Sequence, residues 1–224
     1  MSDCCSTQRE NAGHGRHDLI VVGAGSAGFS AAITAAEQGA QVALIGHGTI
    51  GGSCVNVGCV PSKALIRAAE TIHHANRAAG RFDGVQAEAR VTDWRAQVAQ
   101  KDALVDSLRQ AKYADLLPAY NNVVYHEGRA RLIPGGVEAG GRRFAADRVI
   151  IATGTRPSFP SIPGLADVSP LDSTGALALT ELPRSMIVLG GGYIGAELAQ
   201  TFARVGVAVT LVFRSRLLPE AEPE

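Results

Sequence analysis

Short apolar runs, glycine turns and alanine-rich stretches alternate along the first part of this chain. Leu19–Val22 is wholly apolar and rich in β-branched residues, which is typical of a parallel strand buried on both faces. After a glycine turn, the stretch Gly28–Gln38 predicts a helix that stops at Gly39. Val42–Ile45 predicts a second strand. These residues therefore predict one strand–helix–strand unit.

The middle of the chain predicts two long helices and several further strands. Pro61–Ala79 is strongly helix-forming and has a proline suited to a first turn, and Trp94–Leu116 carries apolar residues at helical spacing. Further strands are predicted at Asn122–His126, Arg129–Ile133 and Arg148–Ala152, with a turn at Pro134–Gly136.

The first pattern returns about 167 residues later. Met186–Leu189 predicts a strand, a glycine turn follows, Tyr193–Val205 predicts a helix, and Val207–Phe213 predicts the next strand. A proline-rich stretch from Pro157 to Pro170 separates the two patterns and marks a domain boundary.

The repeated unit predicts an α/β fold. A Rossmann-like domain with a parallel sheet is followed by the start of a second Rossmann-like domain. The predicted boundaries are a flexible tail over residues 1–16, a first domain over 17–156 and an incomplete second domain over 157–224. Hydrophobic residues make up 46% of the chain and charged residues 19%, which is typical of a globular protein.

Charge and hydropathy exclude several classes of partner. The 21 basic and 21 acidic residues cancel, so the chain has no electrostatic signature for nucleic acid or an anionic membrane. No apolar run reaches the ~18 residues of a membrane helix. The polar N-terminus lacks the apolar core of a secretory signal. The sequence therefore predicts a cytoplasmic protein.

Two glycine motifs carry the first chemical prediction. Gly23-Ala24-Gly25-Ser26-Ala27-Gly28 follows a strand and opens a helix, the context in which this spacing binds a dinucleotide. The first glycine makes the tight turn, the second lets the backbone approach a pyrophosphate, and the third lets helix and strand pack closely. Gly190-Gly191-Gly192-Tyr193-Ile194-Gly195 has the same context. Two dinucleotides are predicted, and a tight turn without a ligand is the alternative for each motif.

Two cysteines five positions apart carry the second prediction. The loop between Cys54 and Cys59 can close a strained disulfide. Cys59 is predicted at or just before the start of the Pro61–Ala79 helix, where helix-end N–H groups stabilise a thiolate. Lys63 lies four residues on and adds positive charge near Cys59. A structural disulfide and half of a zinc site are the alternatives, although no second cysteine pair has suitable zinc-ligand spacing.

The segment Gly51–Lys63, which reads GGSCVNVGCVPSK, resembles the redox-disulfide signature of the flavin- and pyridine-nucleotide-dependent disulfide oxidoreductases. Glutathione reductases, dihydrolipoyl dehydrogenases and mercuric reductases belong to this family. The resemblance covers residues 18–224 and is strongest to the mercuric reductases, which Leu65–Ala69, Ala111–Tyr113 and Asp172–Thr174 also match. It implies an N-terminal fragment of a homodimeric protein, so the 224 residues alone are predicted not to turn over NADPH.

The resemblance also implies an activity. Electrons would pass from NADPH through FAD to a redox-active Cys54–Cys59 disulfide. Cys59 would face the flavin, Cys54 would attack the substrate, and Lys63 would pair with Glu197 near the flavin. The implied substrate is mercuric ion, held transiently by the two soft thiolates and reduced to elemental mercury in detoxification. Alternatives are an organic disulfide substrate or, in another class, a non-catalytic thiol redox or metal-binding protein.

FAD is implied at the first glycine motif and NADPH at the second. The candidate FAD residues are Gly23, Gly25, Ser26, Gly28, Gly48, Gly52, Ser53, Lys63, Ala130, Thr153 and Gly154. The candidate NADPH residues are Gly190, Gly192, Tyr193, Gly195, Arg214 and Arg216. Arg214 lies 19 residues after Gly195, where it can pair with a 2′-phosphate, so NADPH is predicted over NADH. Solvated arginines are the alternative.

Two positions depart from the expected pattern or stand outside it. Gly46, followed by His47, occupies the place of the acidic residue that usually holds a ribose. Weak FAD retention is therefore predicted, and Gly46→Glu is predicted to tighten FAD. The alternative is that His47 or the backbone already holds the ribose. Cys4 and Cys5 form a vicinal pair in the tail, interpreted as idle thiols with a soft-metal site as the alternative.

Overall fold

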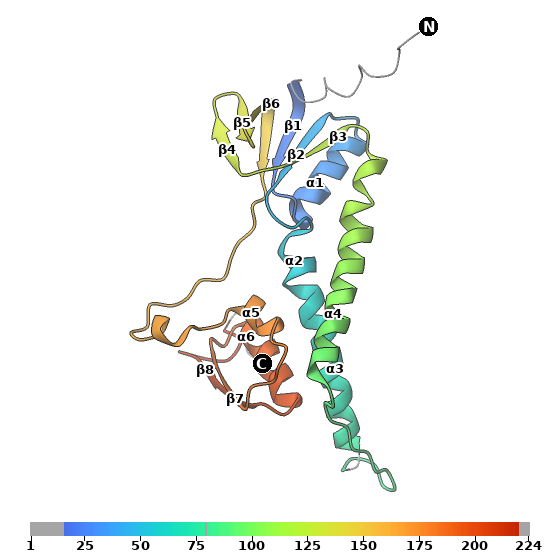
Figure 1. Cartoon of the computed structure of the whole chain (residues 1–224), viewed down its shortest axis with the longest axis vertical. Helices are drawn as coiled ribbons and strands as arrows, with labels where there is room; N and C mark the ends of the chain where they lie inside the picture. The colour runs from blue at the N-terminus through green and yellow to red at the C-terminus, as the bar shows by residue number, and fades with distance from the viewer. Residues whose placement is uncertain (1–15, 79, 220–224) are drawn as a thin grey trace. The chain divides into compact units, whose positions relative to one another are not determined.

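The computed structural model describes residues 16–78 and 80–219 (Figure 1). By its internal contacts the chain divides into two compact units. The first unit runs to Asn56 and continues over Asp106–Arg156, and the second comprises Val57–Val105 and the chain from Pro157 onward. Each unit is therefore built from two separate stretches of sequence.

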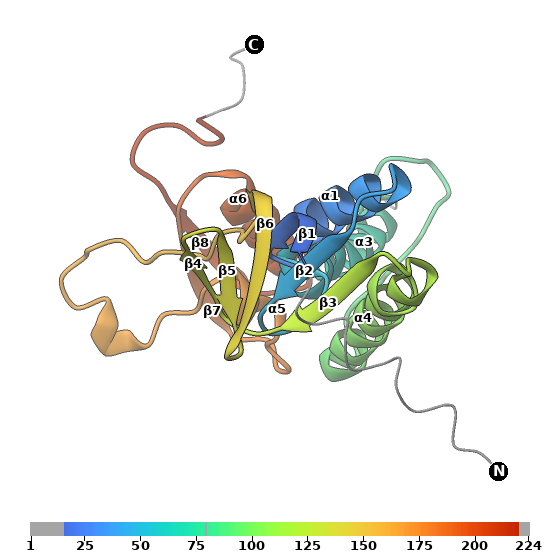
Figure 2. The ribbon, with the colours of Figure 1, turned by 90° about the horizontal axis from the view of Figure 1, so that it is seen from above.

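A six-stranded sheet in the order β3-β2-β1-β6-β5-β4 forms the frame of the first unit (Figure 2). Its strands are β1 (Arg16–Val22), β2 (Val42–Gly46), β3 (Val123–Glu127), β4 (Ala130–Ile133), β5 (Gly136–Ala139) and β6 (Arg142–Ile151). β1 pairs in parallel with β2 and β6, and β2 pairs in parallel with β3. The pairings β4–β5 and β5–β6 are antiparallel. This mostly parallel α/β sheet confirms the predicted fold class.

Apolar side chains cover both faces of the parallel strands. The helix α1 (Ser26–Glu37) packs Phe29 and Ala32 against Val21 and Leu44 on one face. On the other face, Ile20 and Ile45 pack with Val137 and Phe144. The core residues of β2 are buried along the whole strand, as predicted for a strand covered on both sides. The unit also contains the short helix α2 (Gly52–Asn56), a π-helical turn (Gln110–Ala114) and a 3₁₀ turn (Leu117–Ala119).

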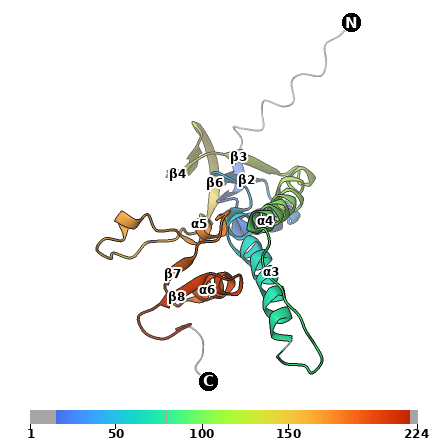
Figure 3. The same cartoon turned by 60° about the horizontal axis from the view of Figure 1, so that its bottom comes forward.

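The second unit packs helices around a two-stranded parallel sheet. Its elements are α3 (Cys59–Ala78), α4 (Trp94–Arg109), a 3₁₀ turn (Ala166–Val168), α5 (Ser173–Leu177), β7 (Ser185–Leu189), α6 (Tyr193–Arg204) and β8 (Ala208–Val212). The helix α6 lies against the β7–β8 sheet (Figure 3). Leu65 and Ala69 of α3 share one apolar cluster with Leu198 and Phe202 of α6. The last residues of α4 cross the unit boundary at Val105.

Side chains of α4 also anchor the segment around α5. The Trp94 indole Nε1 donates to the Leu179 carbonyl at 2.8 Å, and the buried Lys101 ammonium donates to the Leu177 carbonyl at 3.1 Å. Both bonds satisfy carbonyls at or just beyond the C-terminal end of α5, which otherwise lack helical partners.

Among the described residues, no helix is long and apolar enough to cross a membrane.

Several elements differ from the sequence predictions. The predicted Trp94–Leu116 helix is α-helical only to Arg109 and continues as a π-helical turn. The strand β5 was not expected, and β6 begins at Arg142 instead of residue 148. β1 begins at Arg16, the last residue of the predicted tail, while Cys4 and Cys5 lie outside the described residues. By its internal contacts, the segment Val57–Val105 belongs to the second unit, whereas the sequence interpretation placed these residues in the first domain.

A buried histidine in β1 is expected to make the first unit sensitive to acid. Among the described atoms, the His17 Nδ1 has no hydrogen-bond partner, and the ring packs near Phe144. Burial lowers the pKa of His17 below its ordinary value of 6.5, with Asp18 acting in the opposite direction. The folded chain therefore binds fewer protons here than the unfolded chain below about pH 6.5. The free energy of unfolding should fall as the pH drops through that window.

We therefore expect a lower unfolding temperature at about pH 5.5 than at about pH 7.5. Replacing His17 by phenylalanine should shrink this difference, because phenylalanine has no proton to bind. Thermal unfolding followed by circular dichroism at both pH values measures it. An equal difference in the variant and the wild type would show that other groups cause the acid sensitivity.

Candidate functional site

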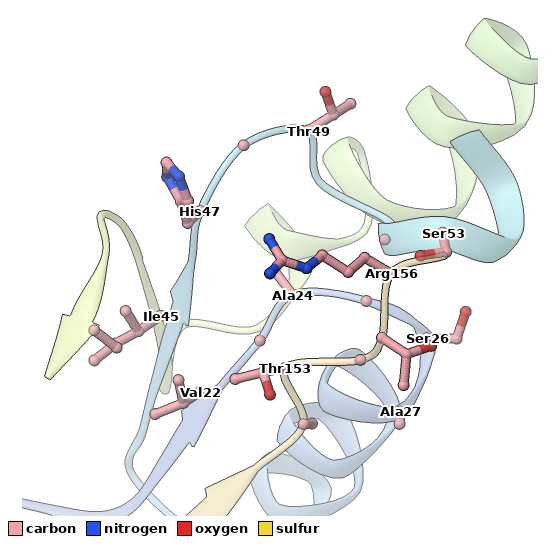
Figure 4. A pocket seen from close by; sticks show the side chains of 18 of the residues that line it. Val22, Ala24, Ser26, Ala27, Ile45, His47, Thr49, Ser53, Thr153 and Arg156 are labelled. Carbon is pink, nitrogen blue, oxygen red and sulfur yellow. The ribbon is translucent and has the colours of Figure 1, made fainter. Parts of the chain in front are cut away.

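A cavity of about 900 Å³ opens at the carboxyl ends of β1, β2 and β6 (Figure 4). Its size is within the usual range for small-molecule and cofactor sites, and its place is where open α/β sheets bind ligands. The predicted FAD residues that line it are Gly23, Gly25, Ser26, Gly48, Gly52, Ser53, Ala130, Thr153 and Gly154. The structure thus gathers residues from four separate stretches of the first unit. Of the other two predicted FAD residues, Gly28 does not line the cavity and Lys63 belongs to the second unit.

The first glycine turn fits only glycine at two of its positions. Gly23 has a φ of +117°, and a Cβ there would lie 2.1 Å from the Ala152 carbonyl oxygen. A Cβ on Gly28 would lie 1.7 Å from the Gly23 carbonyl oxygen and 3.3 Å from the Val21 side chain. The predicted close approach of helix and strand at the third glycine is confirmed, and its tightest contact is with the turn itself.

The second glycine of the motif meets a neighbouring glycine loop. The Gly51 N–H donates to the Ala24 carbonyl at 2.9 Å. A Cβ on Gly52 would lie 2.6 Å from the Gly25 Cα, so the two loops touch through backbone alone. Gly25 is the N-cap of α1, where no side chain caps the helix and the first turn contains no acidic residue. The first-turn N–H groups of α1 are therefore suited to receive an anion.

The charge of the cavity wall also suits a pyrophosphate. Two arginines and one histidine are among its lining residues, namely Arg129, Arg156 and His47, and none of the described lining residues is acidic. The sequence interpretation named neither of the two arginines as a cofactor contact. Their place in the sequence could have indicated them, because Arg129 directly precedes the predicted FAD residue Ala130 and Arg156 closely follows the predicted FAD residue Gly154. Together with the bare glycine cradle, the positive wall fits a bound dinucleotide.

Tyr113 is a supporting residue that sequence interpretation missed. Its hydroxyl lies 3.2 Å from the Ser26 hydroxyl, and its ring meets the Phe29 ring edge-on at 4.9 Å. A Cβ on Gly51 would lie 3.2 Å from the same ring. Tyr113 reaches this place from the π-helical turn, a rare element that often marks functional sites. It therefore supports both the start of α1 and the neighbouring glycine loop.

The second glycine turn repeats the geometry of the first. Gly190 has a φ of +119°, and a Cβ on Gly195 would lie 2.1 Å from the Gly190 carbonyl oxygen. Gly192 is the N-cap of α6, again without a side-chain cap. The Leu218 N–H donates to the Gly191 carbonyl at 2.7 Å, so the segment after β8 returns to the turn. The structure therefore brings the exposed Arg214 and its neighbours near the predicted nucleotide turn.

The two thiols belong to consecutive helices. Cys54 lies in α2 and lines the cavity of the first unit, and Cys59 is the first residue of α3 in the second unit. Both are exposed. The prediction that Cys59 stands at the start of a helix is confirmed. None of the described residues that line the cavity belongs to α3.

An ion pair joins α3 to α6 within the second unit. The Lys63 Nζ lies 2.7 Å from both carboxylate oxygens of Glu197. This is the pair that the family resemblance implied. In a second, looser ion pair the cation is on α6 and the carboxylate on α3, with Arg204 Nη1 3.9 Å from Glu70 Oε1. Both pairs lie beside the apolar cluster that α3 and α6 share.

We expect the Lys63–Glu197 pair to contribute little to stability. The two side chains are 55% and 40% exposed, and exposed ion pairs are worth about 0–1 kcal/mol. Glu197→Gln should lower the free energy of unfolding by less than about 1 kcal/mol in urea titration. Glu70→Gln is the matched control on α3. A loss of several kcal/mol for Glu197→Gln alone would show that the carboxylate is needed for the fold.

The profile of the pyridine nucleotide-disulphide oxidoreductases matches residues 17–224. The chain belongs to this family. Its members use FAD and NAD(P)H, which agrees with the two glycine turns and the cavity described above. Both the predicted family and the predicted cofactor classes are confirmed.

Individual relatives in this oxidoreductase family are mercuric reductases. The chain is 46% identical to mercuric reductase of Streptomyces lividans over 217 residues, which covers 94% of the chain and 45% of the relative. It is also 46% identical to mercuric reductase of Lysinibacillus sphaericus, with 93% and 38% covered. The predicted resemblance to mercuric reductases is confirmed. The chain spans less than half the length of these curated relatives.

A solved structure of the same type is the Cu(II) complex of the HOCl-induced flavoprotein disulfide reductase RclA from Escherichia coli. The TM-score is 0.76 at 32% identity, and the match covers 91% of this chain and 44% of the other. The fold of this oxidoreductase chain therefore agrees with that of a flavoprotein disulfide reductase.

Proposed function

We propose that this chain binds FAD in the cavity of the first unit and a pyridine nucleotide at the glycine turn of the second. The Cys54–Cys59 pair then receives the electrons and delivers them to mercuric ion. The observation that carries the proposal is the 46% identity with mercuric reductases over 94% of the chain. The cavity and its uncapped helix support the cofactor part of the proposal.

The residues that would hold FAD are those of the glycine cradle. When bound, FAD supplies a two-electron relay between a nicotinamide and a thiol pair. The first-turn N–H groups of α1 would bind the pyrophosphate, and Gly25 would let the backbone come close to it. Arg156 would add positive charge at the cavity wall. Tyr113 would keep Ser26 and α1 in place through the contacts described above.

The thiols would form the substrate site. Mercuric ion is a soft cation, so the sulfur ligands Cys54 and Cys59 suit it better than oxygen or nitrogen ligands. The bound mercuric ion gains two electrons and leaves as elemental mercury. NADPH supplies these two electrons as a hydride, so the overall reaction also yields NADP⁺ and one proton. Lys63, held by Glu197, would contribute positive charge one helical turn after Cys59.

Mercury binding by the 224-residue chain tests the thiol part directly. With Cys4 and Cys5 replaced by serine, we expect one mercuric ion per reduced chain. Cys54→Ser or Cys59→Ser should each weaken binding by at least about 100-fold, because one of two sulfur ligands is lost. Calorimetry with a competing thiol measures the affinity. Full-strength binding by either single variant would contradict the proposal.

A disulfide substrate is the second candidate function. It is favoured by the 32% identity with a flavoprotein disulfide reductase. The test is to reduce the chain and then offer mercuric ion, oxidised lipoamide or glutathione disulfide in separate samples. Stable binding of mercury with slow thiol loss to both disulfides supports the first candidate. Rapid oxidation of Cys54 and Cys59 by one disulfide, with weak mercury binding, supports the second.

A further inference from the structure

The end of β2 has no room for the acidic residue that usually contacts a ribose. Gly46 is buried, and a Cβ on it would lie 2.8 Å from the Ala24 Cβ and 2.8 Å from the Tyr125 hydroxyl oxygen. Tyr125 belongs to β3, which pairs with β2 in parallel. The tyrosine side chain therefore fills the space in which an acidic side chain at position 46 would begin.

This finding corrects the prediction made for Gly46→Glu. Tyr125 could rotate its hydroxyl away, but the Ala24 Cβ is fixed by the backbone of the glycine turn. The single substitution should therefore disturb the turn instead of tightening FAD. Burial, together with Glu127, raises the pKa of Tyr125, so its hydroxyl stays neutral and does not replace a carboxylate. The ribose contact has to come from another residue.

His47 is the first residue after β2 that lines the cavity with a polar side chain. It is exposed, and the Arg129 Nε donates to its Nε2 at 3.1 Å. Because Nε2 accepts this bond, the ring carries its proton on Nδ1. Arg129 follows Gly128 just after β3, so the pair links the ends of two neighbouring strands. The arginine thereby fixes both the tautomer and the direction of the imidazole ring.

The same corner of the cavity offers hydrogen-bond donors where an acidic residue would offer acceptors. Thr49 follows His47 on the loop after β2, and Ala24 lies in the turn after β1 (Figure 4). Arg129 and Ala130 also line the cavity. A ribose hydroxyl can accept as well as donate, so it can bind to an N–H group as well as to a carboxylate.

We propose that the Nδ1–H of His47, oriented by Arg129, hydrogen-bonds one ribose hydroxyl of the adenosine half of FAD and so takes over part of the role of the absent acidic residue. This inference rests on the proposed function, because it requires FAD in the cavity of the first unit. His47 is the binding residue in this assignment, and Arg129 is a positioning residue that acts through it.

The test compares FAD with an analogue that carries 2′,3′-dideoxyadenosine and therefore lacks both ribose hydroxyls. Binding to the 224-residue chain is followed by quenching of flavin fluorescence. We expect His47→Ala to weaken FAD about tenfold and to leave the analogue within about twofold of the wild type. His47→Gln keeps an N–H donor and should restore part of the FAD affinity.

The positioning role of Arg129 has its own signature. Arg129→Gln should weaken FAD less than His47→Ala does, and it should add little when both substitutions are combined. His74→Ala, on the exposed side of α3 in the other unit, is the matched control and should change neither affinity. Circular dichroism tests whether each variant is folded. We expect all of them to fold, because the replaced side chains are exposed.

Three outcomes separate this inference from the proposal on which it rests. A loss that His47→Ala shows for FAD but not for the analogue supports the ribose contact. Equal losses for both ligands, or no loss for either, overturn it while the flavin site stands. If the wild-type chain binds neither FAD nor the analogue, both this inference and the proposed flavin site are overturned.

Discussion

Replacing Gly28 by alanine is expected to unfold the first unit or to destabilise it by about 3 kcal/mol or more. The added Cβ would lie 1.7 Å from the Gly23 carbonyl oxygen, and this oxygen belongs to a turn with little freedom. Gly23 is itself fixed, since its N–H donates to the Ile45 carbonyl at 2.7 Å and its Cα faces the Ala152 backbone. Urea unfolding measures the loss, which is a large part of the usual total stability.

Gly25→Ala in the same motif is the matched control. A Cβ there would lie 3.4 Å from the Gly52 Cα, an ordinary contact, and the φ of −86° suits any residue. We expect this variant to keep most of its stability but to bind FAD more weakly, because the methyl group stands where the pyrophosphate would approach. Equal stability of the Gly28→Ala and Gly25→Ala variants would contradict the inference that Gly28 is too tightly packed to carry a Cβ.

The second large effect is expected at Arg214. Arg214→Glu should weaken binding of NADP⁺ by about 10- to 100-fold and leave NAD⁺ nearly unchanged. It removes a charge-assisted bond to the 2′-phosphate and puts a like charge beside that phosphate. Arg214 is exposed and follows β8, on the segment that the Leu218–Gly191 hydrogen bond ties to the glycine turn. Calorimetry of the chain with each nucleotide measures both affinities.

Arg216 provides the comparison for this experiment. One of its guanidinium nitrogens donates to the Pro219 carbonyl at 2.6 Å, so part of the guanidinium is already used in a local hydrogen bond. Arg216→Ala should therefore reduce NADP⁺ affinity less than Arg214→Glu. An unchanged preference for NADP⁺ in Arg214→Glu would defeat the assignment of the 2′-phosphate to this residue.

Local patterns predicted the parts of the fold that local physics controls. The two strand–glycine turn–helix units were found because buried parallel strands are continuous apolar runs and because each turn needs glycine. The helix α2 was missed, since Gly52–Asn56 contains residues with weak helix propensity. The strand β5 was missed because it is a short strand of Gly136, Val137, Glu138 and Ala139 with no clear alternation.

Long-range packing set the limits of prediction in the candidate site. The residues of the glycine cradle follow from spacing in the sequence, and nine of them line one cavity. The hydrogen bond between His47 and Arg129 joins residues 82 positions apart, and nothing in the local pattern of either one indicates it. The space that Tyr125 takes beside Gly46 is likewise a property of two paired strands. Such contacts depend on tertiary structure, which residue patterns do not contain.

The interleaved make-up of the two units has a consequence for how the chain is made. Lys63 of α3 and Glu197 of α6, which form an ion pair, are separated by 134 residues. At ribosomal speeds of about 5–20 residues per second, the partner helix is synthesised on the order of 10 seconds later. During that interval the apolar side chains of α3, including Leu65 and Ala69, lack the neighbours that α6 supplies in the finished unit. The apolar face of α3 is therefore open to aggregation until α6 has been synthesised.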